Sequence, residues 1–594
     1  MYLARRPIAA VFVALTLSAT VIANENKELE RWLDQLVEIS EPGFGYSTYF
    51  AGGEFLPYEG TGEMGVLVLG VSKATRSDTL RKVVEQGADA VPSLLKHLND
   101  ARTIKMEPVK GMMWMDFLDE YDYNRRTRKT KPKGVNRDDT LNDNHPNEHA
   151  VTVGDLCFVA LGQIVNRNFA ATRYQPSGGA VVSSPTYSAV LRRVILDEWS
   201  GLTRERHKKR LIDDFVNPDH EERLIGAYQR LAFYYPECVE SLVLKRLAEP
   251  CYDVFKTSEF VREKLYRGKD AGDRKKLLEA FVAEHGEVAR QGILLELFDD
   301  LDSQEATEEH RRSPPLDAKY DARACLIDLY GYPKDVRSKS RPLLLPPEHC
   351  VQARFIGSLT HDPSQKVGDA VQNLFLQFSK DDYFAAACLK CLASRGYGSF
   401  LVEQLNKIDT AAAKENRLHL AFIEAVSSSK EPAVRDKLLA IVRSTSNEAY
   451  FMAALPAAPR SQNDLVWKSA VAILDKLPAE TERGEELLGM IGERFPDRAK
   501  AVYRSFLAAG SPQRAETLCV VLWDGNPLAI ELLAPLLDDK RSLNGFVKPM
   551  RVCDRAATAV SQATRTIPFD SDWSTAEKDK QIEVLRKYCN EKKK

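Results

Sequence analysis

The sequence lacks an excess of charge of either sign. Lys and Arg number 83, and Asp and Glu number 85, so the net charge of the 594 residues is −2. Such a chain has no overall field that would draw it to nucleic acid or to an anionic membrane. We therefore expect no nucleic-acid partner. Charged residues make up 28% and hydrophobic residues 44% of the chain, which is typical of globular proteins.

Beyond residue 22 the sequence also lacks apolar runs of the ~20 residues that span a bilayer. The strongly apolar run Ile8–Ile22 follows a short basic head and precedes the polar stretch 24–28. This order predicts a secretory signal peptide over residues 1–23, with cleavage after Ala23. A membrane anchor is the alternative, but the run is short for one. We expect an exported protein, periplasmic or extracellular, with no membrane span after cleavage.

Strand-like alternation of apolar and polar residues is scarce, and Ala180–Val182 is a minor candidate. This excludes a mainly β class. A helix is predicted over about 27–40, and a Gly- and aromatic-rich loop completes the N-terminal region 24–76. From Ser77, a predicted cap, helical periodicity continues with short breaks at Pro, Gly, Asn or Asp. The chain is too long for one core of usual size, so we predict an all-α array over residues 77–590.

Internal repeats support an array. The segment Leu98–Arg102 (LNDAR) recurs as Leu537–Arg541 (LDDKR), and each copy is followed by a second helix. An Asp is expected to open that helix, because its carboxylate accepts hydrogen bonds from free backbone N–H groups. A third copy of this second helix begins at Val367-Gly368-Asp369. The residues that define the repeat are Asp100, Arg102, Asp155, Asp369, Asp539, Arg541 and Asp554.

On these residues the chain resembles the HEAT-like α-solenoid family. The segment Val151–Arg167, with Tyr174-Gln175-Pro176 after it, looks most like exported HEAT-like proteins of planctomycete-type bacteria. The resemblance implies stacked helix pairs and binding of other macromolecules, but no chemistry. A two-helix unit cannot bury its apolar stripe alone, and stacking would bury it in one continuous core.

The copies differ in one connection. Nine residues separate Arg541 from Arg551, whereas 48 lie between Arg102 and Val151. We interpret residues 103–149 as a charged insertion, and long loops in compact arrays are often functional. The insertion contains Trp114, the basic residues Arg125, Arg126 and Arg128, and the sequence HPNEH.

HPNEH matches the H-x-x-E-H pattern of zinc peptidases. On a helix, His145 and His149 would share a face and bind zinc, and Glu148 would act as general base. Pro146 allows a helix only if it starts there, and Asp155 indicates that the helix begins about six residues later. The alternative is a loop leading into a structural helix, which we favour. This metal is the cofactor that the sequence suggests; otherwise we expect none.

Other motifs favour structural interpretations. Gly60–Gly65 spells G-x-G-x-x-G but lacks the preceding strand that a dinucleotide site needs. Cys388 and Cys391 form C-x-x-C inside a helical pattern, where buried free thiols are expected. The basic stretch Arg204–Arg210 could grip an acidic partner, but a solvated helix face is the simpler interpretation.

Aromatic loop residues are the remaining binding candidates. Tyr46, Phe55 and Tyr174 could line a groove, since aromatic side chains supply contact area at low entropic cost; plain loop packing is the alternative. We expect an exported, non-enzymatic α-solenoid scaffold with a protein or polysaccharide partner. The alternatives are a metal-dependent hydrolase that uses HPNEH, and a helper in the assembly or modification of another exported enzyme.

Overall fold

A computed structural model gives the fold as two compact units, Met1–Ser358 (unit 1) and Leu359–Lys594 (unit 2). The boundary falls inside the range expected for the helical array. The all-α class is confirmed, because helices dominate the described chain and each strand has only two or three residues. The structure describes residues 27–40, 55–58, 77–110, 112–114, 148–174, 180–218, 221–310, 321–337, 340, 348–409, 416–477, 484–508, 510–523, 525–543 and 550–592.

The described part of unit 1 begins with a helix over residues 27–35 that continues into the 3-10 turn η1 (Leu36–Glu38). The helices and turns that follow are α2 (Asp78–Glu85), η2 (Gly87–Ala90), α3 (Val91–Lys96), α5 (Val153–Val165), α6 (Ala189–Trp199), α7 (Arg204–Val216), α8 (Glu221–Tyr234), η3 (Pro236–Cys238), α9 (Val239–Leu247), α10 (Val254–Phe260), the π-helical turn η4 (Val261–Leu265), α11 (Ala271–His285), α12 (Glu287–His310), α13 (Ala322–Tyr330) and α14 (His349–Ser358).

The described residues of unit 1 include five short strands: β1 (Val109–Lys110), β2 (Met112–Trp114), β3 (Glu148–His149), β4 (Thr172–Tyr174) and β5 (Ala180–Val182). β1 pairs antiparallel with β3. β5 lies between β2, to which it is parallel, and β4, to which it is antiparallel. The predicted strand at 180–182 is therefore β5, and its partner β2 belongs to the insertion.

Unit 2 consists of η6 (Leu359–His361), α15 (Gln365–Phe378), α16 (Asp382–Ala393), α17 (Gly398–Asn406), α18 (Arg417–Val426), α19 (Pro432–Ser444), α20 (Glu448–Ala454), η7 (Leu455–Ala457), η8 (Arg460–Gln462), α21 (Asn463–Leu474), α22 (Glu485–Arg494), α23 (Pro496–Ala508), α24 (Pro512–Val521), α25 (Leu528–Leu533), η9 (Ala534–Asp538), the hairpin β6 (Ser542–Leu543) and β7 (Met550–Arg551), α26 (Val552–Thr564) and α27 (Thr575–Lys592).

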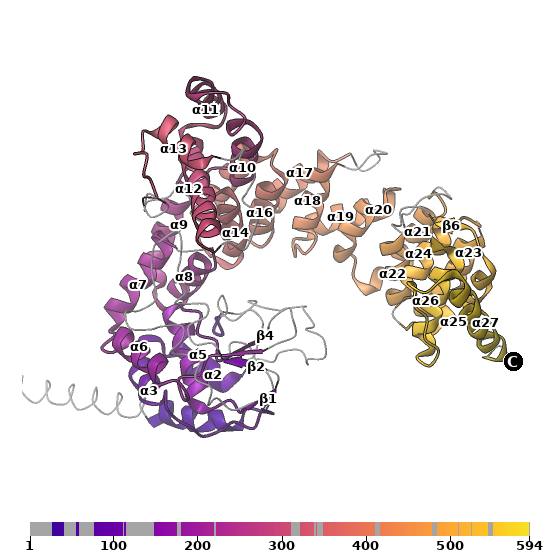
Figure 1. Cartoon of the computed structure of the whole chain (residues 1–594), viewed down its shortest axis with the longest axis horizontal. Coiled ribbons are helices and arrows are strands. Elements are labelled where there is room, and N and C mark those ends of the chain that lie inside the picture. The colour runs from indigo at the N-terminus through magenta and orange to yellow at the C-terminus, as the bar shows by residue number, and fades with distance from the viewer. Residues whose placement is uncertain are drawn as a thin grey trace, which may run out of the picture. The chain divides into compact units, whose positions relative to one another are not determined.

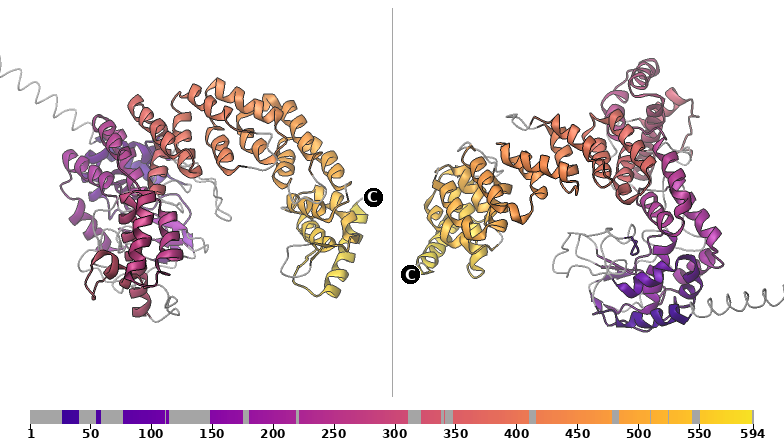
Figure 2. Two further views of the ribbon diagram at one scale, coloured as in Figure 1. Left: turned by 90° about the horizontal axis from the view of Figure 1, so that it is seen from above. Right: turned by 180° about the vertical axis from the view of Figure 1, so that it is seen from behind.

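In unit 2 most helices pack against the helix two positions further along the chain. This holds for α16 with α18, α17 with α19, α18 with α20, α19 with α21, α20 with α22, α22 with α24, α23 with α25, and α24 with α26. Figure 2 shows these helices following one another side by side. Their inward stripes, such as Val434, Leu438 and Val442 on α19, are buried at spacings of four residues. That spacing places apolar side chains on one helix face.

Helix starts follow from side-chain capping. Ser77 Oγ accepts a hydrogen bond from Leu80 N and begins α2, as predicted, and Gly87 follows its end with φ of 59°. Ser, Thr, Asp and Asn side chains likewise cap many other helices, because they satisfy N–H groups that have no partner inside the helix. Capping residues of this kind are Thr152, Ser188, Thr203, Asp253, Asp270, Asp321, Ser364, Asp381, Asn416, Asn447 and Ser511.

The core of the first part of unit 1 surrounds α5, whose thirteen residues are all buried. Helices α2, α3 and α7 pack against it (Figure 1). A fully buried helix cannot bond water at its ends, so its terminal N–H and C=O groups must find partners in the protein. Those partners make up the polar part of the candidate site.

Candidate functional site

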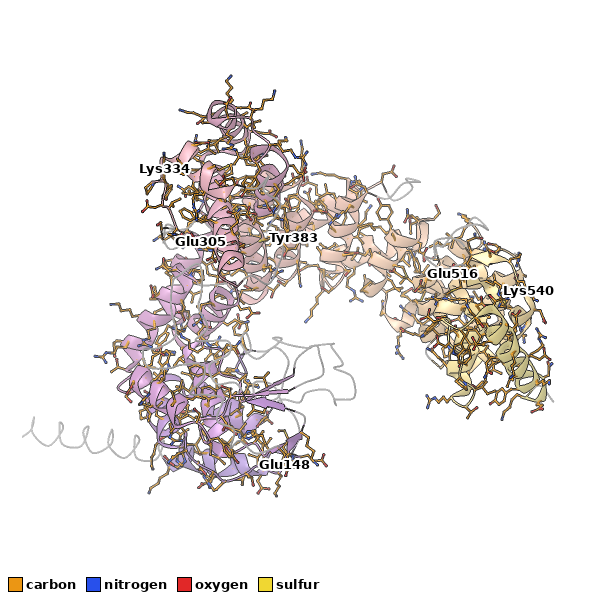
Figure 3. All side chains as sticks on the ribbon, viewed as in Figure 1. Glu148, Glu305, Lys334, Tyr383, Glu516 and Lys540 are labelled. Carbon is orange, nitrogen blue, oxygen red and sulfur yellow. The ribbon has the colours of Figure 1, made fainter. Side chains whose placement is uncertain are left out.

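The HPNEH segment ends in a strand. Glu148 and His149 form β3, paired with Lys110 and Val109 of β1. Neighbouring residues of a strand point to opposite faces; accordingly Glu148 is exposed and His149 is buried. Figure 3 shows Glu148 at the periphery of unit 1. His149 therefore lies on a strand and not on the helix that would let it share a face with His145, as H-x-x-E-H zinc binding requires. His145 itself lies outside the described residues.

His149 belongs instead to a fully buried polar group at the start of α5. Its Nε2 lies 2.9 Å from Asp155 Oδ2, and both side chains are 0% exposed. Ser184 Oγ donates to Asp155 Oδ1 at 2.5 Å. Thr152 N–H donates to the same carboxylate, and Asp155 N–H donates to Thr152 Oγ1, which forms a capping box. Thr152 is therefore the cap of α5, and Asp155, which was expected to open the helix, lies at its third position and completes the capping box.

A Ser, a His and an Asp thus meet, but not in a catalytic arrangement. Nucleophilic catalysis needs the serine hydroxyl to bond the imidazole, with the carboxylate behind it. Here Ser184 donates to the carboxylate of Asp155. The group joins the return strand of the insertion (His149), the start of α5 (Asp155) and the segment after β5 (Ser184), so it fastens three segments together.

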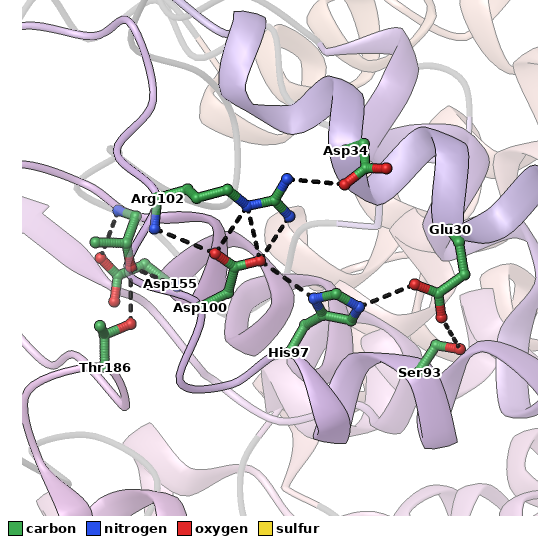
Figure 4. A network of polar contacts seen from close by, with 9 residues as sticks. Glu30, Asp34, Ser93, His97, Asp100, Arg102, Asp155 and Thr186 are labelled. Carbon is green, nitrogen blue, oxygen red and sulfur yellow. Dashed lines mark hydrogen bonds and ion pairs between the residues drawn. The ribbon is translucent and has the colours of Figure 1, made fainter.

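A second network holds the turn before the insertion (Figure 4). Arg102 donates through its backbone N–H and its guanidinium to Asp100, and its Nη1 lies 2.8 Å from Asp34 Oδ1. The Arg102 hydrogen bonds lower the pKa of Asp100 to about 2. His97 lies between Asp100 Oδ2 (3.2 Å) and Glu30 Oε2 (3.0 Å). The network ties the helix over 27–35 to α3.

The same turn occurs in unit 2. Arg541 N–H and Nε each lie 3.0 Å from Asp539 Oδ1, and Nη2 lies 2.6 Å from Oδ2, which closely matches the Arg102–Asp100 distances. Backbone bonds join Val552 N to Arg541 O, and Cys553 N to Asp539 O. The equivalent bonds in unit 1 join Val153 N to Arg102 O, and Gly154 N to Asp100 O.

The second helices correspond as well. α5 and α26 both have thirteen residues, and both carry the Asp at their third position. Each ends at a residue of positive φ, Asn166 at 57° and Arg565 at 55°. Among the non-glycine residues that the structure describes, these two alone have a positive φ. Arg551 bonds Asp554 and so takes the place that His149 has beside Asp155. The two segments are copies of one structural module.

Asp369 departs from this pattern and corrects our interpretation of the third copy. α15 begins at Gln365, and Ser364 caps it by accepting from Val367 N. Asp369 consequently lies in the second turn, where it accepts a 2.6 Å hydrogen bond from the Tyr397 hydroxyl. The helix therefore begins earlier than predicted, because Ser364 caps it three residues before Val367.

The opposite end of α5 is capped by cationic and imidazole side chains. Arg230 Nε donates to Gln163 O, His207 Nε2 to Ile164 O (2.9 Å), and Arg223 Nη1 to Asn166 O (2.9 Å). Arg167 Nη1 reaches Asn166 O and also pairs with Asp214 at 2.6 Å. Positive charge near the C-terminus of a helix is favourable because the helix dipole is negative there.

His207 is held neutral by this position. Its side chain is 1% exposed, and burial lowers its pKa to about 4. The Tyr235 hydroxyl lies 3.0 Å from Nδ1. These caps were not among the predicted site residues. The sequence holds one signal for them, because Arg223 and Arg230 fall on the same face of α8 as the buried Ala227 and Leu231. A basic residue on an apolar helix face signals a buried partner.

The aromatic candidates have different locations. Phe55, a candidate for lining a groove, is 0% exposed, and its ring packs edge-on against Phe233 and Tyr234, as in the alternative of plain packing. Its partners lie far along the chain, which explains why a loop composition concealed a core residue. Trp114 and Tyr174 lie on β2 and β4, the two edges of the sheet centred on β5. Tyr46, Arg125, Arg126 and Arg128 lie outside the described residues.

The other motifs are used for packing or lie elsewhere. Cys388 and Cys391 are buried in α16, and burial raises the pKa of the Cys391 thiol to about 12. On α7, Arg204, Lys208 and Arg210 pair with Asp89, Glu237 and Glu198, as expected for a solvated face. Gly60–Gly65 lies outside the described residues.

Within the part of the chain that the structure describes, no helix combines the length and apolar character needed to cross a bilayer. No protein-family model matches the sequence, and no curated protein is significantly similar to it.

Proposed function

We propose that the protein is an exported, non-enzymatic α-solenoid scaffold of HEAT-like helix pairs. In this proposal the insertion 103–149, carried by the first module, binds a protein or polysaccharide partner. The packing of helices on their second neighbours in unit 2 supports the solenoid, since stacked repeats contact mainly their neighbours. Insertions in repeat proteins often lie on the binding face.

One observation carries the proposal: the same module is built once with the insertion and once without it. Arg541 and Arg551 are joined by residues 542–550, whereas the corresponding Arg102 and Thr152 are joined by residues 103–151. The Asp-x-Arg turn, the backbone bonds and the thirteen-residue helix are present in both copies. In unit 2 the module forms around a short connection, so its turn and its second helix do not depend on a long one.

The insertion is nevertheless anchored at defined points. Its strands β1 and β3 pair with each other, and β2 pairs with β5, which follows α5. The return strand is fastened by the buried His149–Asp155 pair. Fixing a chain at defined points has an entropic cost. We infer that this cost is offset because the insertion presents a surface to a partner.

The test closes the insertion at its own hairpin. Lys110 and Glu148 face each other on β1 and β3, so residues 111–147 can be replaced by Asn-Gly, a favoured two-residue hairpin turn. The matched control closes the other module: Leu543 faces Met550, so residues 544–549 are replaced by the same Asn-Gly. Both variants keep the Asp-x-Arg turn and the following helix.

The mature chain and the two variants are each mixed with two probes. The first is the exported-protein fraction of the source cell, read by cross-linking and mass spectrometry. The second is a set of neutral and acidic polysaccharides, read by gel retardation. We expect a saturable partner that the wild type and the control retain and that the 111–147 variant loses. Equal binding by all three chains, or saturable binding by none, would refute the proposal.

A further inference from the structure

A separate hydrophobic core lies in the middle of unit 1. Its buried members, among them Phe260, Leu278, Leu297, Phe298 and Leu326, all come from residues 260–336. The helices concerned, α10 to α13, pack extensively among themselves. Polar bonds add to the cohesion: the Tyr266 hydroxyl donates to Asp300 (2.6 Å), and Arg274 pairs with Asp328 (2.8 Å).

The two ends of this region meet. Tyr252, just before α10, forms a parallel β-bridge with Glu348, just before α14. His349 N–H donates to Tyr252 O at 2.6 Å. The Tyr252 ring lies against α12 at Gly292, where an added Cβ would approach the ring to 2.4 Å. Close chain ends are typical of a domain inserted into another.

We call the bridged residues Tyr252 and Glu348 the stem. The helices before Tyr252 and after Glu348 contact each other directly. Gln352 of α14 donates through Nε2 to Arg246 O of α9 at 3.1 Å. Phe355 of α14 packs edge-on against Phe215 of α7 and Tyr228 of α8. Helices α7, α8, α9 and α14 therefore make a continuous array without help from residues 253–347.

We propose that residues 253–347 are an autonomous helical module, inserted into the array of unit 1 and hinged at the Tyr252–Glu348 stem. Rotation at the stem reorients α10 to α13 without exposing either core. Glu305 and Lys334, labelled in Figure 3, mark parts of the module. This inference is independent of the scaffold function, since it concerns how unit 1 is divided and moves.

The test is hydrogen exchange on the full mature chain with two matched variants. Leu297 lies in the module core at 0% exposure, and Leu231 lies in α8 at 1% exposure. We expect Leu297→Ala to speed exchange in α11 to α13 on the order of 100-fold and to leave α7 and α8 unchanged. Leu231→Ala should have the opposite pattern, and the His349 amide should exchange faster than either core.

If either variant speeds both sets of amides equally, the region is one cooperative unit and the inference fails. It also fails if the His349 amide is as protected as α8. Should a variant not fold, exchange of the wild type over a urea series gives the same answer. Two autonomous bodies then show two opening free energies with different urea slopes, whereas one body shows a single slope.

Discussion

The buried His207 makes the stability of unit 1 depend on pH in a way that can be calculated. Neutral His207 donates from Nε2 to Ile164 O and is almost wholly enclosed. Burial lowers its pKa from 6.5 to about 4. Between these values the unfolded chain binds a proton that the folded chain does not, so stability falls as pH falls. Above pH 6.5 the neutral state prevails in both forms, and the effect vanishes.

The magnitude follows from the shift. A difference of about 2.5 pKa units at 1.36 kcal/mol per unit gives about 3 kcal/mol of unfolding free energy, lost between pH 6.5 and pH 4. The variant His207→Gln retains an N–H donor for Ile164 O but cannot titrate. Its stability should therefore be nearly independent of this proton, although the change lowers stability at neutral pH.

The assay is urea unfolding with pulsed hydrogen exchange, read at α7 and α8, at several pH values from 7.5 to 4. We expect the stability difference between the wild type and His207→Gln to shrink by about 3 kcal/mol over this range. Asp100 titrates below the window, because its pKa is about 2. Parallel pH profiles for the two proteins would refute the reasoning, since they would place the titration elsewhere.

Four further predictions concern two glycines, the buried thiols of α16 and the Asp-x-Arg turn of unit 2. In urea unfolding, Gly226→Ala should lower the unfolding free energy by about 1–3 kcal/mol, because the added Cβ would lie 2.2 Å from Asn166 Oδ1. Gly357→Ala should raise it by about 0.5–1 kcal/mol, because a Cβ at this position in α14 would have nothing within 4 Å. Cys388 and Cys391 should resist iodoacetamide until the chain unfolds, as mass spectrometry would detect, because burial raises both thiol pKa values. Arg541→Lys should lower the free energy of thermal unfolding by about 1 kcal/mol, because lysine cannot reproduce the forked hydrogen bonds to Asp539. An unchanged melting temperature would contradict a stabilising role for these bonds.

The sequence allowed the helical class to be predicted because period and capping are local properties. Ser77 and Asp155 lie next to the N–H groups that they cap. The Asp-x-Arg turns were detectable for the same reason, since Asp539 and Arg541 are two residues apart. The prediction that Asp369 opens a helix was wrong, because Ser364, a few residues upstream, caps α15 instead.

The candidate site was harder to predict from the sequence, because its contacts join residues that are far apart along the chain. Loop composition could not tell that Phe55 packs on Tyr234, or that Ser184 reaches Asp155. The place of Arg230 on an apolar face of α8 signals burial, but its partner could not be predicted, because that partner is the end of a different helix, α5. Such contacts are set by how helices stack, which a periodic pattern does not specify.

Elemental analysis of the purified mature chain tests most directly whether this protein is a scaffold or a metal hydrolase. It would be made beside His145→Ala, which spares the buried His149–Asp155 pair. The scaffold account predicts no stoichiometric metal in either protein. About one zinc per wild-type chain, lost in His145→Ala, would contradict it, because a zinc-dependent hydrolase needs an ion held by side chains such as His145.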